Sequence, residues 1–141
     1  WDTAQTFDDP EFERSPYELA MAWNVDLDRA EDFIGRAALE KERADGSRFV
    51  MKGFEIAGDC ELVDGAELFA DINGDQVQVG TLPSVSWSHD AKSWIGLASL
   101  KSAHADIAEG YVQVNGDNCP CRITTLPFIS LQRRRQVPAP M

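Results

Sequence analysis

The sequence lacks the features that would place it in a membrane, carry it through one, or bind it to a nucleic acid. It has no apolar run of about 18 residues, the length that a membrane-spanning helix needs, and no basic segment with an apolar stretch opens it as a signal peptide would. Positive charge is scarce, with 13 lysines and arginines against 24 aspartates and glutamates and a net charge of −11. Phosphate backbones need a basic surface, so nucleic acid is excluded as the main partner. The chain begins at Trp1 rather than at methionine, which indicates either a cut in a longer protein or an engineered boundary.

Cysteine is scarce as well. Cys60, Cys119 and Cys121 are an odd number in a chain without a visible export signal, so we expect reduced thiols and a cytoplasmic location. Cys119 and Cys121 fall on one face of a strand together with Ile123, as small buried hydrophobic residues would. No second pair of cysteines or histidines stands at zinc-binding spacing, so the sequence predicts no metal site.

Groups suited to catalysis are few. His89 lies in a polar turn and His104 in a loop, and neither belongs to a recognisable arrangement of base and nucleophile. The carboxylates that crowd residues 1–32 are typical of a solvated acidic face, and no pair of them stands out for glycosidase chemistry. The sequence therefore predicts no catalytic residue in this chain.

What the sequence does contain is a β pattern. The steps Asn73-Gly74 and Asn115-Gly116 lie between alternating segments and predict β-hairpins, because both residue types accept positive φ. The expected strands cover residues 48–57, 67–71, 76–79, 94–100, 111–114 and 119–124. Short strands joined by hairpin turns favour a mainly β fold, a six-stranded antiparallel barrel of jelly-roll or Greek-key type.

One helix is expected before the barrel. Asp32 can cap a helix that runs from about Phe33 to Ala44, with Gly46 just past its end. Arg36 should pair with an acidic residue one turn later, such as Glu40. One face of the helix would be formed by Phe33, Ala37 and either Leu39 or Glu40.

The chain divides into four segments. They are an extended acidic lead-in (1–14), an interdomain segment with the helix that forms the tail of a preceding domain (15–46), a C-terminal β-barrel (47–130) and a basic, proline-containing tail (131–141).

Several short motifs occur in a recognisable order. They are Ser15-Pro16 with Glu18, Trp23 and Val25; Asp32-Phe33-Ile34-Gly35-Arg36 with Leu39; Gly53-Phe54-Glu55-Ile56; Val79-Gly80-Thr81 with Ser84 and Ser88; Trp94-Ile95-Gly96-Leu97-Ala98; and Leu126-Pro127-Phe128-Ile129. Over roughly residues 15 to 130, this order resembles the glycine-cleavage T-protein (aminomethyltransferase) family at its C-terminal barrel.

The resemblance implies a C-terminal fragment of a tetrahydrofolate-dependent one-carbon transferase, whose cofactor lies in a cavity among three domains. The implied partners are the N-terminal domains of the same parent chain and a small-molecule donor of an aminomethyl or methyl group. The acid–base carboxylate and the main folate-binding residues of the family belong to the earlier domains. We therefore expect the fragment alone to be inactive and to bind tetrahydrofolate weakly or not at all.

The same resemblance suggests roles for three residues. Trp23 would either pack a domain interface, which we favour, or form part of the wall of the folate cavity. Arg133 follows the closing Pro-Phe motif and is the candidate for clamping a folate carboxylate, with a solvated basic tail as the alternative. Glu18 is expected to be a structural hydrogen-bond acceptor rather than a catalyst.

Departures from the family leave alternatives open. Ala20 and Ala22 stand where members commonly have glycine, residues 82–85 replace a Thr-Ser-Gly turn, and His89 stands where proline often occurs. The family also includes sulfur and aryl-ether demethylases. The alternatives are the C-terminal part of a sarcosine- or dimethylglycine-oxidising flavoprotein, or a non-catalytic interaction or ligand-binding barrel module.

Overall fold

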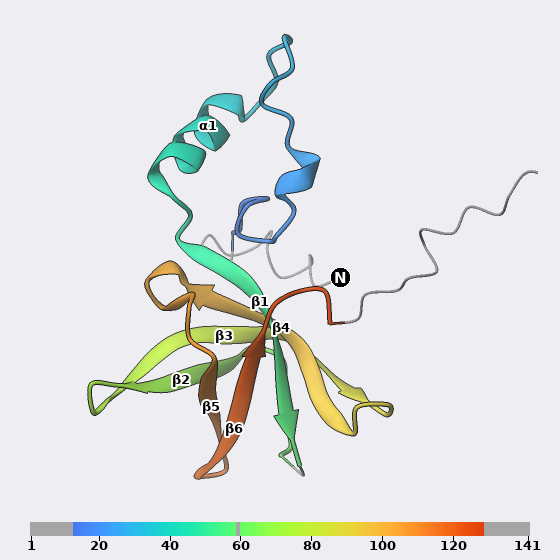
Figure 1. The fold of residues 1–141 in the computed structure, drawn as a ribbon, viewed down its shortest axis with the longest axis vertical. Helices are drawn as coiled ribbons and strands as arrows, with labels where there is room; N and C mark the ends of the chain where they lie inside the picture. Colours follow the sequence, from blue (N-terminus) through green and yellow to red (C-terminus); the bar gives the residue numbers. More distant parts are fainter. Residues whose placement is uncertain (1–12, 59, 129–141) are drawn as a thin grey trace, which may run out of the picture.

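The molecule consists of a β-barrel with an N-terminal lobe above it, as the computed structural model shows (Figure 1). The structure describes residues 13–58 and 60–128. Its elements are η2 (Ala22–Asn24), α1 (Arg36–Asp45), β1 (Phe49–Ala57), β2 (Ala66–Ile72), β3 (Asp75–Ser88), β4 (Ser93–Lys101), η3 (Ser102–His104), β5 (Glu109–Val114) and β6 (Asp117–Thr124). Within those ranges, no helix has the length and apolar character needed to cross a lipid bilayer.

The barrel closes on itself in the strand order β1-β4-β3-β2-β5-β6, and each neighbouring pair that forms a ladder is antiparallel. Strands β2, β3 and β4 form a meander, and β1 lies beside β4, which is the Greek-key arrangement. The predicted six-stranded antiparallel barrel is confirmed. Closure removes the exposed sheet edges that a two-sheet arrangement of such short strands would leave.

Both predicted hairpins are confirmed. Asn73 (φ 55°) and Gly74 (φ 90°) join β2 to β3, and Asn115 (φ 51°) and Gly116 (φ 91°) join β5 to β6. Positive φ at two successive central residues is the mark of the tight turn that matches strand twist. The strand predicted at residues 76–79 is the beginning of the much longer β3.

The core fills the barrel from all six strands. Apart from Leu62, which comes from the loop between β1 and β2, its buried residues lie on the strands: Phe54, Ile56, Leu68, Ala70, Val79, Leu82, Ala98, Leu100, Val112, Cys119 and Cys121. Burial of one large apolar side chain contributes about 1.5–3 kcal/mol. The cysteines of β6 face inward as predicted, with Ile123 packed against the same cluster.

The helix begins later than predicted, at Arg36 rather than near Phe33. Asp32 does not cap it, because its Oδ1 accepts a hydrogen bond from the neighbouring Phe33 N–H (2.9 Å). Gly35, with φ 91°, stands at the cap position in the left-handed region and so separates residues 32–34 from the helical turn. The predicted end is confirmed, since the Gly46 N–H donates to the Glu42 carbonyl.

The predicted helix face is only partly right. Leu39 is half-buried, whereas Ala37 and Glu40 are exposed, and α1 buries no residue fully. Arg36 does pair with Glu40, at 2.8 Å between Nε and Oε1. The guanidinium also donates to the Leu27 carbonyl (2.9 Å), so it ties the preceding loop to the first turn of the helix.

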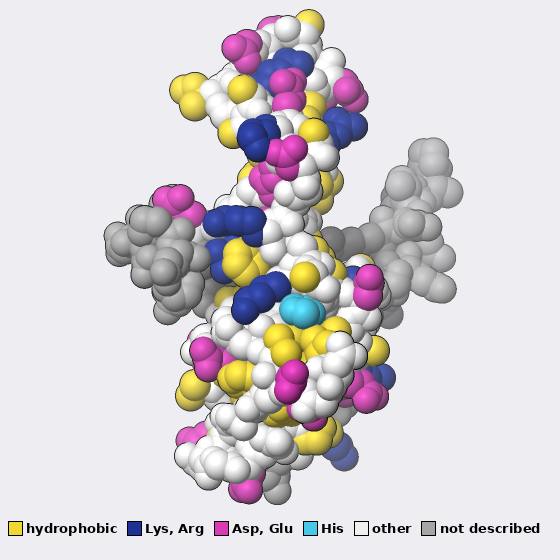
Figure 2. All heavy atoms as spheres, turned by 90° about the vertical axis from the view of Figure 1, so that its left-hand side faces the viewer, with side chains coloured by type: hydrophobic (Ala, Val, Ile, Leu, Met, Phe, Trp, Pro, Cys, Tyr) yellow, Lys and Arg dark blue, Asp and Glu magenta, His cyan; other side chains and the backbone are white. Residues whose placement is uncertain are grey.

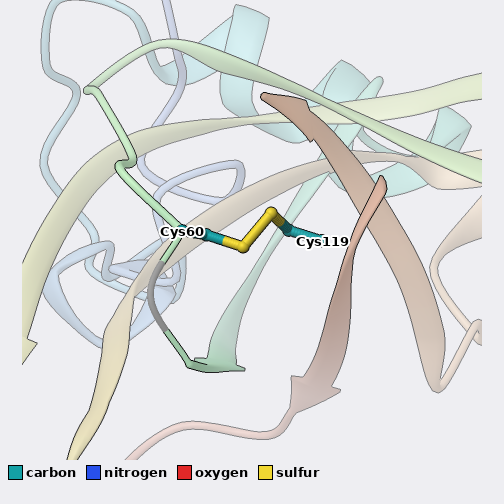
Figure 3. Close-up of a disulfide and its surroundings, with 2 residues drawn as sticks. All are labelled: Cys60 and Cys119. Carbon is teal, nitrogen blue, oxygen red and sulfur yellow. A yellow bond between two sulfur atoms is a disulfide. The ribbon is translucent and has the colours of Figure 1, made fainter. Parts of the chain in front are cut away.

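The expectation of three reduced thiols is wrong for two of them. Cys60 and Cys119 form a disulfide between the β1–β2 loop and β6 (Figure 3), with their Cα atoms 6.4 Å apart. The two residues are 59 positions apart, so only the barrel topology brings them within the distance that a disulfide requires. Cys121 remains a free, buried thiol.

Candidate functional site

The candidate site lies where the N-terminal lobe meets the first strand of the barrel. Five polar residues form it, and we call them the junction cluster: Ser15, Glu18, Glu42, Ser47 and Arg48. They come from the turn at residues 15–21, from α1, and from the short link into β1. Acidic and basic side chains alternate over the lobe on the face shown in Figure 2.

Glu18 is the centre of the cluster and is almost fully buried, with 1% of its surface exposed. Its Oε1 accepts hydrogen bonds from the backbone N–H of Arg48 (3.2 Å) and from Nε of the same residue (3.1 Å). Its Oε2 accepts from the Ser15 N–H (3.1 Å) and from Nη2 of Arg48 (3.2 Å). The prediction that Glu18 is a structural acceptor is confirmed.

Ser15 and Glu18 bond each other twice. The Glu18 N–H donates to the Ser15 Oγ (3.2 Å) while the Ser15 N–H donates to the Glu18 carboxylate, which is the reciprocal pattern of a capping box. Pro16 follows Ser15 at the position where a missing N–H costs nothing. The sequence Ser-Pro-Tyr-Glu therefore folds into its turn by local bonds, before any contact with the barrel.

The pKa of Glu18 is set by two opposing effects. Burial raises it, but the hydrogen bonds and positive charge of Arg48, together with the backbone N–H groups of Ser15 and Arg48, outweigh burial and hold the pKa below its ordinary value. The pKa of the Arg48 guanidinium is raised in turn, chiefly by its hydrogen bond to Glu18. Glu18 is therefore ionised at neutral pH and has no proton to donate.

A second layer of bonds ties the helix to this centre. Ser15 Oγ (2.6 Å) and Ser47 Oγ (2.5 Å) both donate to Glu42 Oε1, so one carboxylate of α1 holds the turn before the helix and the link after it. An open hollow of about 320 Å³ lies beside these groups, with Ala38 and Lys41 of α1 on its wall. The carboxylates and hydroxyls of the cluster are occupied by one another, so the arrangement positions the lobe on the barrel.

The turn at residues 15–21 ends on a strained residue. The Met21 N–H donates to the Pro16 carbonyl (2.8 Å) and the Ala20 N–H to the Tyr17 carbonyl (3.2 Å), the paired bonds of a Schellman cap. This cap puts Ala20 in the left-handed region, with φ 57°. Residues with a Cβ atom resist that conformation, which explains why glycine suits the position better.

We expect Ala20→Gly to raise the free energy of unfolding by about 0.5–1 kcal/mol, because glycine adopts the left-handed conformation without the Cβ clash. Ala22→Gly is the matched control: this position also departs from the family, but it lies in η2 and its φ is not positive. The melting temperature should rise for Ala20→Gly and fall for Ala22→Gly. A lower melting temperature for Ala20→Gly would contradict the strain at this cap.

Of the two predicted folate-binding residues, the structure describes only Trp23. Trp23 lies in η2 with 80% of its surface exposed, so it packs little against this chain. Arg133 lies outside the described residues. Ile34, in the loop before α1, is fully exposed and is a second large apolar side chain of the lobe that faces solvent. Within residues 13–58 and 60–128, no three histidine, cysteine or acidic side chains are placed to hold a metal ion.

Sequence analysis missed the partners of Glu18. The Ser-x-x-Glu spacing was a readable signal for the bond between Ser15 and Glu18. Nothing comparable marked Arg48, which lies 30 residues beyond Glu18.

The structure is a closed Greek-key barrel with an N-terminal lobe, and the buried Glu18 carboxylate joins the two through Arg48. The model of the glycine cleavage T-protein C-terminal barrel domain matches residues 50–129, so the chain belongs to that family.

Similar proteins are much longer than this chain. An aminomethyltransferase of Stenotrophomonas maltophilia (strain K279a) is 32% identical over 121 residues, which cover 86% of this chain and 31% of that protein. An aminomethyltransferase of Prochlorococcus marinus (strain MIT 9303) is 29% identical over 121 residues, which cover 85% of this chain and 31% of that protein. The crystal structure of glycine cleavage system aminomethyltransferase T from Bartonella henselae has a TM-score of 0.70 at 19% identity, covering 84% of this chain and 33% of that one. The chain thus spans about a third of the length of these relatives.

Proposed function

We propose that this chain is the C-terminal part of a tetrahydrofolate-dependent enzyme that transfers an aminomethyl or methyl group. The observation that carries the proposal is the family match over the barrel, together with aminomethyltransferase relatives that match along most of this chain. In such an enzyme the tetrahydrofolate would accept the one-carbon unit from a small-molecule donor. The described residues contribute the barrel and its attached lobe, and the acid–base groups would come from other domains of the same parent chain.

Two exposed apolar side chains of the lobe are compatible with a role in packing against those domains. Trp23 and Ile34 both face solvent, and Trp23 is a residue type with a large contact area. The junction cluster holds this lobe to the barrel through a buried ionised carboxylate. We therefore propose that Trp23 packs a domain interface, with the wall of the folate cavity as the second role, and that Arg133 contacts a folate carboxylate.

The activity is tested on the parent protein. Mass spectrometry should detect methylene- or methyl-tetrahydrofolate when the parent is given tetrahydrofolate and a panel of glycine-derived, sulfonium and aryl-ether donors. The isolated chain should transfer nothing, and calorimetric titration should find weak tetrahydrofolate binding or none. Micromolar binding by the chain alone would contradict this division of labour. A parent that is inactive with every donor would favour a non-catalytic module, and a flavin-linked oxidation of sarcosine or dimethylglycine would favour the flavoprotein alternative.

The role of Trp23 is tested separately by comparing two tryptophans. Trp23→Ala should leave the melting temperature of the isolated chain unchanged, because the side chain is 80% exposed, and should lower that of the parent. Trp87→Ala is the control. The Trp87 ring packs edge-to-face against Trp94 with the ring centroids 5.5 Å apart, so its loss should destabilise both the isolated chain and the parent protein. If Trp23→Ala instead raises only the KM for tetrahydrofolate, Trp23 lines the cavity.

We also propose a cytoplasmic location, which the disulfide does not favour. It was predicted from reduced thiols, and two of the three cysteines form a disulfide. Fractionation of cells that express the parent protein would test it.

A further inference from the structure

The disulfide lies beside one of the two shortest ladders in the barrel wall. Strands β1 and β6 pair over only three residues, from Gly53↔Thr124 to Glu55↔Arg122, whereas β1 and β4 pair over the full length of β1. Beyond the Glu55–Arg122 ion pair, the remainder of β1 and the first half of β6 have no ladder between them. We call this region the β1–β6 seam. Cys60 follows the end of β1 and Cys119 lies in β6, so their bond spans the seam (Figure 3).

The disulfide also holds the loop that crosses one end of the barrel. This loop, which contains residues 60–65, buries Leu62 in the core. Asp64 accepts a hydrogen bond from the Val85 N–H (2.8 Å) and the Gly65 N–H donates to the Leu82 carbonyl (2.8 Å), both on β3. The disulfide attaches the loop covalently to β6. Cleavage of that bond would leave the loop held by the burial of Leu62 and by its hydrogen bonds to β3.

A hollow of about 290 Å³ opens on the seam. It is lined by Glu55, Ala57, Glu109, Gly110, Pro120, Cys121 and Arg122, which come from β1, β5 and β6. Cys121 is one of the lining residues, with 2% of its surface exposed, and burial raises the pKa of its thiol to about 12. Its thiolate is therefore scarce at neutral pH, which keeps it from attacking the neighbouring disulfide.

We propose that the Cys60–Cys119 disulfide is a redox clamp on the β1–β6 seam, which a cellular dithiol reductant opens so that the β1–β2 loop loosens and Cys121 becomes accessible. Cys60 is partly exposed and Cys119 is buried, so the reductant thiolate attacks the Cys60 sulfur. The S–S bond breaks, Cys119 leaves as a thiolate and takes a proton, and a mixed disulfide forms on Cys60. The second thiol of the reductant then displaces Cys60, so two electrons pass to the protein and the reductant becomes a disulfide.

The first experiment counts thiols and measures the accessibility of Cys121. In the native oxidised chain, 5,5′-dithiobis(2-nitrobenzoate) should titrate Cys121 slowly. The double variant Cys60→Ser/Cys119→Ser also has one thiol but no clamp, and its Cys121 should react roughly tenfold faster or more, because the covalent restraint closed a loop of 59 residues. Val77→Ala is the control for general destabilisation, since Val77 packs against the core from β3 and leaves the clamp intact. Its Cys121 should stay slow under conditions where the variant remains folded.

The second experiment locates the opening. Hydrogen exchange of the chain before and after treatment with dithiothreitol should show faster exchange at the Gly65 and Val85 amides, which hold the loop to β3. The amides of Leu19 and Met21, in the turn at the junction, should be unchanged. Three results would each overturn the proposal: three titratable thiols after incubation with oxidised glutathione, a disulfide that resists excess dithiothreitol in the folded chain, or equal exchange in both redox states.

Discussion

Gly96→Ala is expected to destabilise the barrel by about 3 kcal/mol or more, enough to leave a large part of the chain unfolded. A Cβ atom at this position would lie 1.9 Å from the backbone oxygen of Ser84 and 2.8 Å from the ring of Phe54. The oxygen belongs to the strand itself and cannot swing away as a flexible side chain can. Relief would require β3 and β4 to separate along their ladder.

The close approach at Gly96 lies next to a bulge in β3. The pairing with β4 runs from Thr81↔Ser99 to Ser84↔Leu97, so β3 has one residue more than β4 in this interval. Pro83 lies inside the bulge, where its missing N–H leaves no ladder bond unmade. The Ser84 carbonyl, at the end of the bulge, lies where a Cβ atom of residue 96 would stand, so only glycine fits there.

Urea denaturation of Gly96→Ala would measure the decrease in the free energy of unfolding, with Gly53→Ala as the matched control. At Gly53 an added Cβ would meet the Phe128 ring at 2.7 Å, but that ring is 41% exposed and can turn aside. We expect Gly53→Ala to cost about 1 kcal/mol. If the free energy of unfolding of Gly96→Ala lay within about 1 kcal/mol of that of the unmutated chain, the packing described for β3 and β4 would be contradicted.

Glu18→Gln is expected to lower the free energy of unfolding by about 2 kcal/mol at neutral pH, because it removes the buried negative charge that pairs with Arg48 and replaces one acceptor oxygen by an NH2 group, which cannot accept a hydrogen bond. This loss is smaller than that expected for a fully buried ion pair, because the side chain of Arg48 is 64% exposed and water can hydrogen-bond the N–H groups that lose their partner. Glu40→Gln is the control. Its pair with Arg36 is half-exposed, so its loss should change stability by less than about 0.5 kcal/mol.

The same variant should change the pH dependence of stability. The pKa of Glu18 is lower in the folded chain than in the unfolded chain, so at acid pH the unfolded chain binds the extra proton. The contribution of Glu18 is therefore fully present above its ordinary pKa of 4.5 and is lost as the pH falls through the folded value. The free energy of unfolding, measured by urea denaturation at neutral pH and at about pH 3.5, should change less between the two pH values for Glu18→Gln than for the unmutated chain. An equal pH dependence in both would show that other carboxylates account for it.

The sequence by itself determined the parts of this protein that depend on neighbouring residues. Asn-Gly at 73–74 and 115–116 sets two turns, because positive φ is a property of the residues in the turn. The alternation of Val77 and Val79 with glutamine determines which face of β3 enters the core. The order of the short motifs was enough to indicate the family that the barrel match confirms.

Only the tertiary structure decided what depends on residues far apart in the chain. Arg48 meets Glu18 across 30 residues, and Cys60 meets Cys119 across 59, so no local pattern predicts either contact. Helix α1 begins at Arg36 rather than near the local capping signal of Asp32, and the left-handed conformation of Gly35 that separates the two is seen only in the structure. Composition and spacing report the energy of short segments, whereas the Glu18–Arg48 and Cys60–Cys119 contacts depend on the packing of the lobe on the barrel and on barrel closure, which bring distant segments together.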